Sequence, residues 1–146
     1  MRNKSMKVVI LCGGKGTRIR DVNENIPKPM VTVGKYPIIW HVMKSYANFG
    51  YKEFILCLGY KAEVIKDFFL NYHSLTSNFT IDFGNDNEIS FQAEKQPLDW
   101  KIAFVDTGME SLTGSRVSKI RSYIGEDENF MLTYGDGLSD VDISAL

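Results

Sequence analysis

A short apolar run followed at once by a glycine-rich loop constrains the fold of this chain more than any other feature. Residues 7–12 read KVVILC, a continuous, largely β-branched segment typical of a strand buried on both faces of a parallel sheet. The chain then passes directly into Gly13-Gly14-Lys15-Gly16-Thr17-Arg18. A loop at the carboxyl end of such a strand lines the crevice where open α/β sheets bind ligands. We therefore expect an α/β protein whose first strand ends at a binding loop.

Strand-like and helix-like periods then alternate along most of the chain. The expected elements, in order, are an amphipathic helix between Pro37 and Gly50, a strand at 54–58, a helix whose apolar face runs over 64–72, a strand at 102–106, a helix over 117–124 that ends at Gly125, and a buried strand at 130–134. This order predicts a Rossmann-like, doubly wound sheet that is mostly parallel and has helices on both faces.

The segment between the second helix and the third strand departs from this pattern. Apolar residues alternate with polar ones from Phe79 to Phe83 and again from Ile89 to Ala93. The turn sequence Gly84-Asn85-Asp86-Asn87 separates the two stretches. We expect two strands joined by a turn, with one solvated face.

Composition and charge exclude several classes of protein. The chain has 146 residues, with 17 basic and 18 acidic side chains, which argues against a nucleic-acid partner. No apolar run approaches the roughly 18 residues that span a bilayer, so no membrane partner is expected. Cys12 and Cys57 lie in strand-like runs without metal-ligand spacing, which predicts buried, reduced thiols in a cytoplasmic protein. We expect a loosely ordered or disordered extension at residues 1–5 and one nucleotide-binding α/β domain over 6–146.

The glycine-rich loop fits neither of two well-known phosphate-binding templates. The P-loop string G-x-x-x-x-G-K-[ST] is absent. The dinucleotide fingerprint G-x-G-x-x-G begins correctly at Gly14, but Ile19 stands where the third glycine belongs. What remains is a different glycine loop, G-G-x-G-T-R.

Four cations accompany this loop within fourteen residues: Lys15, Arg18, Arg20 and Lys28. Such clustering in a chain of formal net charge −1 suits a triphosphate ligand. The alternative is a glycine turn surrounded by solvated charges. Pro27 and Pro29 flank Lys28, exclude a helix there and predict an extended path.

A second candidate lies after the last expected strand. Asp136 belongs to the string Tyr134-Gly135-Asp136-Gly137, at the edge of the sheet that carries the glycine loop. A carboxylate there is suited to hold Mg²⁺ against substrate phosphates, because Mg²⁺ takes one or two carboxylates and shares the rest of its shell with phosphate and water. The alternative is an ordinary Asx-type turn residue.

Together these strings resemble the sugar-1-phosphate nucleotidylyltransferase family. The signatures are LCGGKGTR at 11–18, PKPM at 27–30 and YGDG at 134–137. The strings that bring the chain closest to the cytidylyl members are PIIWHVMK at 37–44, GYK at 59–61, VDTG at 105–108, LTGSR at 112–116 and YGDGLSDVDI at 134–143. The match runs from about Met6 to the last residue. It implies the fold of the nucleotide-diphospho-sugar transferases.

The resemblance also implies a reaction: CTP and α-D-glucose 1-phosphate give CDP-glucose and pyrophosphate by in-line attack on the α-phosphorus. Arg18 and Lys28 are the implied catalytic residues. Arg18 would offset charge on the leaving pyrophosphate, and Lys28 would contact the α-phosphate and the incoming phosphate. Asp136 would be the Mg²⁺ ligand. Matched position by position, the nucleotide-binding residues are Leu11, Cys12, Gly13, Gly14, Lys15, Gly16, Thr17, Arg18, Lys28, Ser111, Arg116 and Gly135.

The chain departs from the family in two ways. Members of the family are nearly twice as long, and their second half supplies most of the sugar pocket and a second metal-binding aspartate. Ser115 also replaces the usual glycine of the T-G-G-R string. We expect a fragment of a family that forms homo-oligomers. The alternatives are a nucleotide-binding module without catalysis and an enzyme that uses UTP or dTTP.

Overall fold

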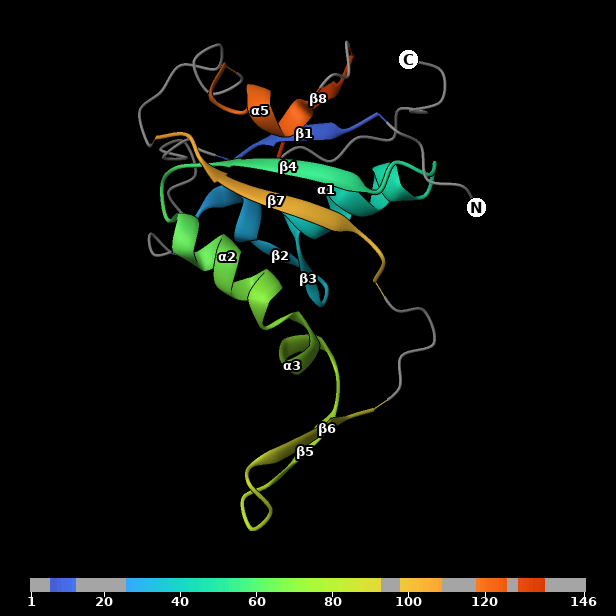
Figure 1. Ribbon diagram of the computed structural model, residues 1–146, viewed down its shortest axis with the longest axis vertical. Helices are drawn as coiled ribbons and strands as arrows, with labels where there is room; N and C mark the ends of the chain where they lie inside the picture. The colour runs from blue at the N-terminus through green and yellow to red at the C-terminus, as the bar shows by residue number, and fades with distance from the viewer. Residues whose placement is uncertain (1–5, 13–25, 93–97, 109–117, 126–128, 136–146) are drawn as a thin grey trace.

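The centre of the protein, in a computed structural model, is a sheet of four parallel strands in the order β7-β4-β1-β8 (Figure 1). The structure describes residues 6–12, 26–92, 98–108, 118–125 and 129–135. The strands are β1 (Val8–Leu11), β4 (Glu53–Leu58), β7 (Lys101–Asp106) and β8 (Met131–Tyr134). All four lie close to the ranges expected from the sequence. Residues 1–5 lie outside the described residues, so the N-terminal extension stays a prediction.

The strand order creates a point where the chain changes direction across the sheet. From β1 the chain steps to β4 and then to β7, and it returns to the other side of β1 with β8. Val8 is therefore paired with Phe54 on one side and with Met131 on the other. In doubly wound sheets, ligands bind outside the carboxyl ends of the strands at such a switch point. The topology directs attention to the ends of β1 and β8.

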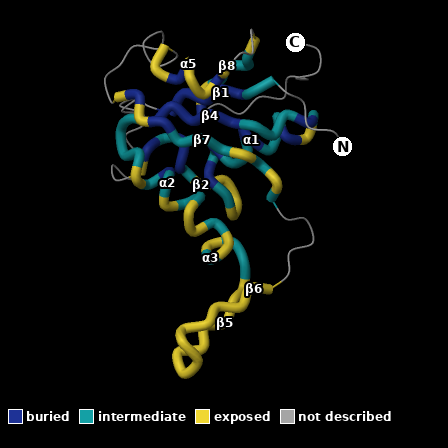
Figure 2. Tube along the Cα trace, in the orientation of Figure 1, coloured by how far each residue is buried: buried dark blue, intermediate teal, exposed yellow. Residues whose placement is uncertain are grey.

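Helices cover both faces of the sheet, which confirms the predicted doubly wound architecture. They are α1 (Ile38–Ala47), α2 (Ala62–Leu70) and α5 (Arg121–Ile124), while the short α3 (Tyr72–Thr76) follows α2 and buries none of its residues. Because successive strand residues point to opposite faces, Val8 and Ile10 pack with Ile39 and Met43 of α1. Val9 and Leu11 share the other core with Ile120 and Ile124. Figure 2 shows β1 and β4 as the most deeply buried part of the fold.

The last strand differs from the expectation of burial on both faces. In β8 the side chains of Leu132 and Tyr134 are 46% and 57% exposed. Burial alternates along β8: Met131 and Thr133 on one face are half-buried, whereas Leu132 and Tyr134 on the other are exposed, and among the described strands β8 pairs with β1 alone. The predicted strand is present, but its predicted burial is wrong.

Two antiparallel hairpins complete the described structure. The first joins β2 (Thr32–Val33) to β3 (Tyr36–Pro37) directly before α1. The second joins β5 (Phe79–Asp82) to β6 (Glu88–Phe91), as the alternating pattern predicted.

The β5–β6 hairpin nevertheless differs from the prediction of a single solvated face. Every residue of both strands is exposed, including the cross-strand pairs Phe79–Phe91 and Ile81–Ile89. The hairpin extends away from the central sheet, where its two strands form a separate sheet of their own (Figures 1 and 2). Alternation alone could not tell whether another element would cover the apolar face.

The two cysteines match the prediction of buried thiols. Both Cys12 and Cys57 are buried thiols. They belong to the cores on opposite faces of the sheet, so they cannot bond to one another without rearrangement of the strands. Among the described helices, none is long and apolar enough to cross a membrane.

Candidate functional site

The carboxyl end of β1 is held to both of its neighbours, β4 and β8, beyond the last paired residues of the sheet. The backbone N–H of Cys12 donates to the carbonyl of Cys57 over 2.9 Å. The N–H of Gly135 donates to the carbonyl of Leu11 over 3.0 Å. These bonds fix the residues that immediately precede the glycine-rich loop and Asp136. The two predicted binding segments therefore start side by side at the switch point.

Gly135 shows how closely three segments approach here. An ideal Cβ at this position would lie 3.1 Å from Sγ of Cys12, 3.3 Å from Cγ2 of Ile10 and 3.4 Å from Cβ of Pro29. Gly135 itself is buried. A Cβ at this position would push against Cys12 and Ile10 and would come into ordinary contact with Pro29, in the segment that carries Lys28. The absence of a side chain lets β8, β1 and the Pro27-Lys28-Pro29 segment meet.

The segment around Lys28 is a turn of 3₁₀-helix, η1 (Lys28–Met30), rather than the extended path expected from its prolines. The N–H of Met30 donates to the carbonyl of Pro27 over 2.9 Å, and that of Val31 to Lys28 over 3.2 Å. Pro29 lies in the first turn, where its missing N–H removes no helical bond. The expectation was wrong because prolines exclude a helix interior, not a single turn.

Lys28 is half-buried within this turn, while Pro27, Pro29 and Met30 are buried around it. The backbone that carries the Lys28 ammonium is thus anchored on both sides. Such anchoring reduces the conformational entropy that a cation loses when it engages an anion. The geometry suits a fixed phosphate contact.

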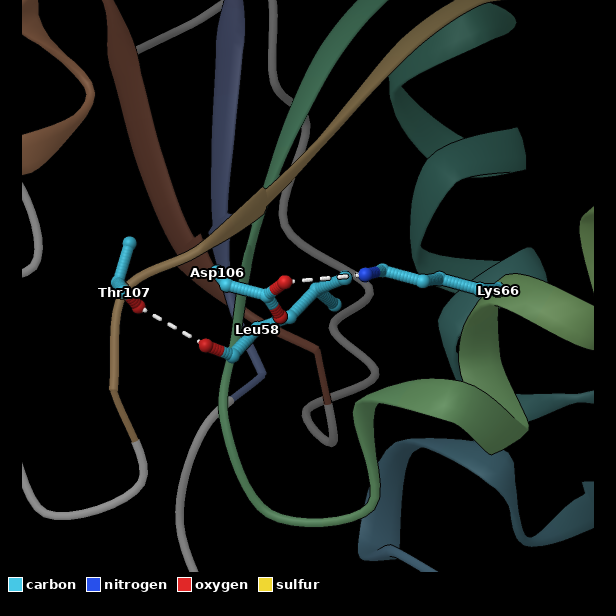
Figure 3. Close-up of polar contacts among 4 residues, drawn as sticks. All are labelled: Leu58, Lys66, Asp106 and Thr107. Atoms are coloured by element: carbon cyan, nitrogen blue, oxygen red, sulfur yellow. Dashed lines mark hydrogen bonds and ion pairs between the residues drawn. The ribbon is translucent and has the colours of Figure 1, made fainter.

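The carboxyl end of β7 carries a further set of polar contacts (Figure 3). Nζ of Lys66 lies 3.0 Å from Oδ2 of Asp106 in an exposed ion pair. Thr107 is fully buried, and its N–H and hydroxyl both donate to the carbonyl of Leu58, over 2.9 Å and 3.1 Å. The VDTG string noted in the sequence therefore ties the end of β7 to β4.

Of the residues expected to bind nucleotide, the structure describes Leu11, Cys12, Lys28 and Gly135. It brings Leu11, Cys12 and Gly135 into one hydrogen-bonded edge and sets the turn of Lys28 against it through Pro29. The others lie outside the described residues, as does the expected Mg²⁺ ligand Asp136, and stay predictions: Gly13, Gly14, Lys15, Gly16, Thr17, Arg18, Ser111 and Arg116.

No individual role for Thr107 follows from the sequence. The available signal was a threonine between an aspartate and a glycine at the end of a strand. Its bonds to Leu58, 49 residues away, could not be read from that spacing.

Two further kinds of site can be examined in the described part of the chain: cavities and clusters of metal-binding side chains. A cavity of about 330 Å³ is lined by Lys35, Tyr36, Leu75, Thr76, Ser77 and Asn78, none of which was expected to bind substrate. No three histidine, cysteine, aspartate or glutamate side chains gather among the described residues to form a metal site.

Comparison with known proteins decides the family. The sequence profile described as nucleotidyl transferase matches residues 7–134, which includes the whole central sheet. The chain belongs to the nucleotidyl transferase family. The resemblance noted from the sequence motifs is therefore confirmed at the level of the family.

Two relatives in this nucleotidyl transferase family are similar along almost the whole chain. A probable glucose-1-phosphate cytidylyltransferase of Bacillus subtilis is 49% identical over 94% of this chain and 53% of its own length. A glucose-1-phosphate cytidylyltransferase of Salmonella typhimurium is 44% identical over 96% of this chain and 54% of its own. The chain spans about half the length of these relatives.

Solved structures agree with the fold. HddC from Yersinia pseudotuberculosis, crystallised in a complex with GMP-PN, superposes with a TM-score of 0.68 at 27% identity. The alignment covers 96% of this chain and 52% of HddC. UTP-bound UGPase from Acinetobacter baumannii superposes with a TM-score of 0.59 at 22% identity, over 93% of this chain and 46% of its own, a likeness of fold alone.

Proposed function

We propose that this chain is the nucleotide-binding part of an enzyme that forms CDP-glucose and pyrophosphate from CTP and α-D-glucose 1-phosphate. The observation that carries the proposal is the convergence at Gly135, which joins the base of the glycine loop, the turn of Lys28 and the start of the YGDG turn. The 49% and 44% identity to cytidylyltransferases supports cytosine as the base and glucose 1-phosphate as the acceptor.

The proposed reaction needs positioning and neutralisation of charge rather than a nucleophilic side chain. A phosphate oxygen of glucose 1-phosphate forms a bond to the α-phosphorus of CTP. The bond from that phosphorus to the oxygen bridging to the β-phosphate breaks, and pyrophosphate leaves with the electron pair. Lys28 would draw the two reacting phosphates together, and Arg18 would offset the charge on pyrophosphate.

Backbone N–H groups of the glycine-rich loop would bind the phosphate groups of CTP. The glycine-rich residues 13–16 can present N–H groups to phosphate oxygens without interference from Cβ atoms. The chain enters this segment from Cys12, whose own N–H already bonds to Cys57. The loop would therefore begin from a fixed point, which lowers the entropic cost of binding.

We also propose a magnesium ion with Asp136 as a protein ligand. The fit rests on donor chemistry and on position. A carboxylate suits Mg²⁺, and the preceding peptide at Gly135 is fixed to Leu11 at the edge of the sheet. When bound, Mg²⁺ would neutralise charge on the triphosphate. The relatives' additional length can supply further ligands.

A pyrophosphate-release assay tests the proposed activity. The purified chain is mixed with CTP, glucose 1-phosphate and Mg²⁺, and the same assay is run with Lys28→Ala and with Lys35→Ala. Because Lys35 is exposed in the β2–β3 turn, its replacement should leave the rate unchanged, whereas Lys28→Ala should abolish it.

The outcomes separate the alternatives. CTP binding without any pyrophosphate release would make this chain a nucleotide-binding module that needs further residues for catalysis. A faster rate with UTP or dTTP than with CTP would overturn the choice of base. Full activity of Lys28→Ala would overturn the role given to Lys28.

We also infer a cytoplasmic location and, as in the longer members of the family, a homo-oligomeric state. The buried thiols of Cys12 and Cys57 support a reducing compartment. Light scattering of the purified chain measures the oligomeric state, and a monomer at micromolar concentration would contradict that part of the inference.

A further inference from the structure

The β5–β6 hairpin is closed at both ends by its own hydrogen bonds. At its base, the N–H of Gln92 donates to the carbonyl of Asn78 over 2.9 Å, and Nδ2 of Asn78 donates to Oε1 of Gln92 over 3.0 Å. At its tip, Nδ2 of Asn85 donates to the Glu88 carboxylate over 2.7 Å. The hairpin extends away from the central sheet, so its local shape is defined by its own residues (Figure 1).

The two sides of this hairpin differ in polarity. Residues directly opposite one another in an antiparallel pair point to the same side, and the sides alternate along each strand. The polar side carries two cross-strand pairs: Thr80–Ser90 and Asp82–Glu88. The apolar side, which we call the hairpin face, carries the other two: Phe79–Phe91 and Ile81–Ile89. The hairpin face itself therefore bears no charged group.

The hairpin face is exposed along its whole length (Figure 2). Its exposed fractions run from 38% at Ile81 to 51% at Ile89, and Phe83 at the tip is 77% exposed. At the base, the His73 ring of α3 lies 6.0 Å from the ring of Phe91. A two-stranded hairpin is marginally stable in water unless another layer covers its apolar side. Exposed apolar surface of this kind marks an interaction site.

The area of the surface indicates the strength of the interaction that it can support. At about 200 Å² for each phenylalanine, the exposed parts of Phe79, Phe83 and Phe91 amount to roughly 300 Å². With the two isoleucines included, two such surfaces packed together would remove on the order of 1,000 Å² from water. Interfaces of this size are weak and reversible.

We propose that the hairpin face is a docking surface for the same face of a second copy of this chain. The occupant must be apolar, because the hairpin face offers no charge to a charged partner. A second copy supplies such a face. Contact between identical surfaces about a two-fold axis is the commonest geometry of homodimers.

The carboxylates of the hairpin favour an antiparallel arrangement of the two copies. Residues 77–92 contain no lysine or arginine, and their three carboxylates all lie toward the tip: Asp82, Asp86 and Glu88. An antiparallel arrangement sends the two tips to opposite ends and packs the Ile81–Ile89 pair of one copy on that of the other. A parallel arrangement would bring both sets of carboxylates together and would be opposed by their repulsion.

Sedimentation velocity of the 146-residue chain, from about 0.1 to 100 µM and without CTP, tests the surface. Ile81→Lys and Ile89→Lys each place a charge on the hairpin face. The matched controls are Thr80→Lys and Ser90→Lys, which add the same charge at neighbouring positions on the polar side. Thermal unfolding followed by tryptophan fluorescence at the lowest concentration shows whether each variant is folded.

We expect the unmodified chain to form a dimer with a dissociation constant of about 1 µM. Ile81→Lys and Ile89→Lys should raise this constant about tenfold or more, because each would bury like charges against one another. Thr80→Lys and Ser90→Lys should stay within about twofold of the unmodified chain. Because the substituted side chains are exposed, all four variants should melt within about 3 °C of the unmodified chain.

Each outcome supports or overturns the proposal. A chain that stays monomeric over the whole range would overturn it and leave the hairpin face to a different occupant. A dimer that lysine on either side weakens equally, or not at all, would place the interface elsewhere and would also overturn it. A large loss of melting temperature in Ile81→Lys and Ile89→Lys alone would show that the hairpin face packs within its own chain. None of these results bears on the proposed function, because no nucleotide is present.

Discussion

The contacts around Gly135 give a direct way to disturb the candidate site without removing any polar group. Gly135→Ala adds one methyl group at the point where β8, β1 and the turn of Lys28 meet. The φ of Gly135 lies outside the left-handed region, so alanine can adopt the backbone conformation. Any effect must come from the close contacts of the new Cβ.

The magnitude follows from those contacts. Distances of 3.1 Å to Sγ of Cys12 and 3.3 Å to Cγ2 of Ile10 are short for a methyl group, so these two neighbours must each move by a few tenths of an ångström, whereas 3.4 Å to Pro29 is an ordinary contact. Overpacking of this kind costs about 1–3 kcal/mol in free energy of unfolding. For a domain of this size, that lowers the melting temperature by roughly 3–10 °C.

Thermal unfolding followed by circular dichroism measures the change, and Gly84→Ala is the control. The Cβ at Gly84 would have a single neighbour, the exposed Asp82 carboxylate at 3.4 Å. The double variant Cys12→Ala, Gly135→Ala removes the atom in shortest contact and should destabilise less than the sum of the single changes. Equal melting temperatures for Gly135→Ala and Gly84→Ala would refute the reasoning about convergence at Gly135.

Two further predictions concern regions away from the site. The β5–β6 hairpin buries none of its strand residues. Replacing residues 81–89 with Asn-Gly should therefore change the melting temperature by no more than about 3 °C. A larger loss would show that the hairpin stabilises the central sheet. The hydrogen bond that Lys52 donates to the Asp99 carboxylate lowers the pKa of Asp99, and this effect outweighs the opposing effect of burial. Asp99→Asn should therefore lower the melting temperature slightly at pH 7. The difference in melting temperature between Asp99→Asn and the unmodified chain should shrink as the pH falls below the ordinary aspartate pKa of about 3.9, and it should vanish below the lowered pKa of Asp99. A difference that grew in acid would contradict the stabilising role given to the Lys52–Asp99 bond.

Local sequence patterns predicted the elements well because their signals lie within one element. The β-branched run at 7–12 and the apolar period after Pro37 each depend on neighbours fewer than ten residues away, and β1 and α1 lie where expected. The glycine-rich loop at the end of the first strand also predicted the correct edge of the sheet, because topology fixes where such loops lie.

The features that sequence did not predict depend on distant partners. The exposure of β8 and of the β5–β6 hairpin depends on which other elements pack beside them, and alternation of apolar residues carries no information on that point. The bond between Thr107 and Leu58 joins residues 49 positions apart. The turn at Lys28 was missed for a different reason, because a single 3₁₀ turn tolerates the prolines that exclude a longer helix.

We expect CTP to bind at the carboxyl ends of β1 and β8, and amide chemical-shift mapping of the 16.6 kDa chain can locate the bound nucleotide. The isotope-labelled protein is titrated with CTP and then with ATP. We expect CTP-dependent shifts in the amides of Leu11, Cys12, Lys28 and Gly135, little change in the β5–β6 hairpin, and weaker binding of ATP. Shifts confined to the cavity around Lys35 and Thr76, or no shifts at all, would contradict it.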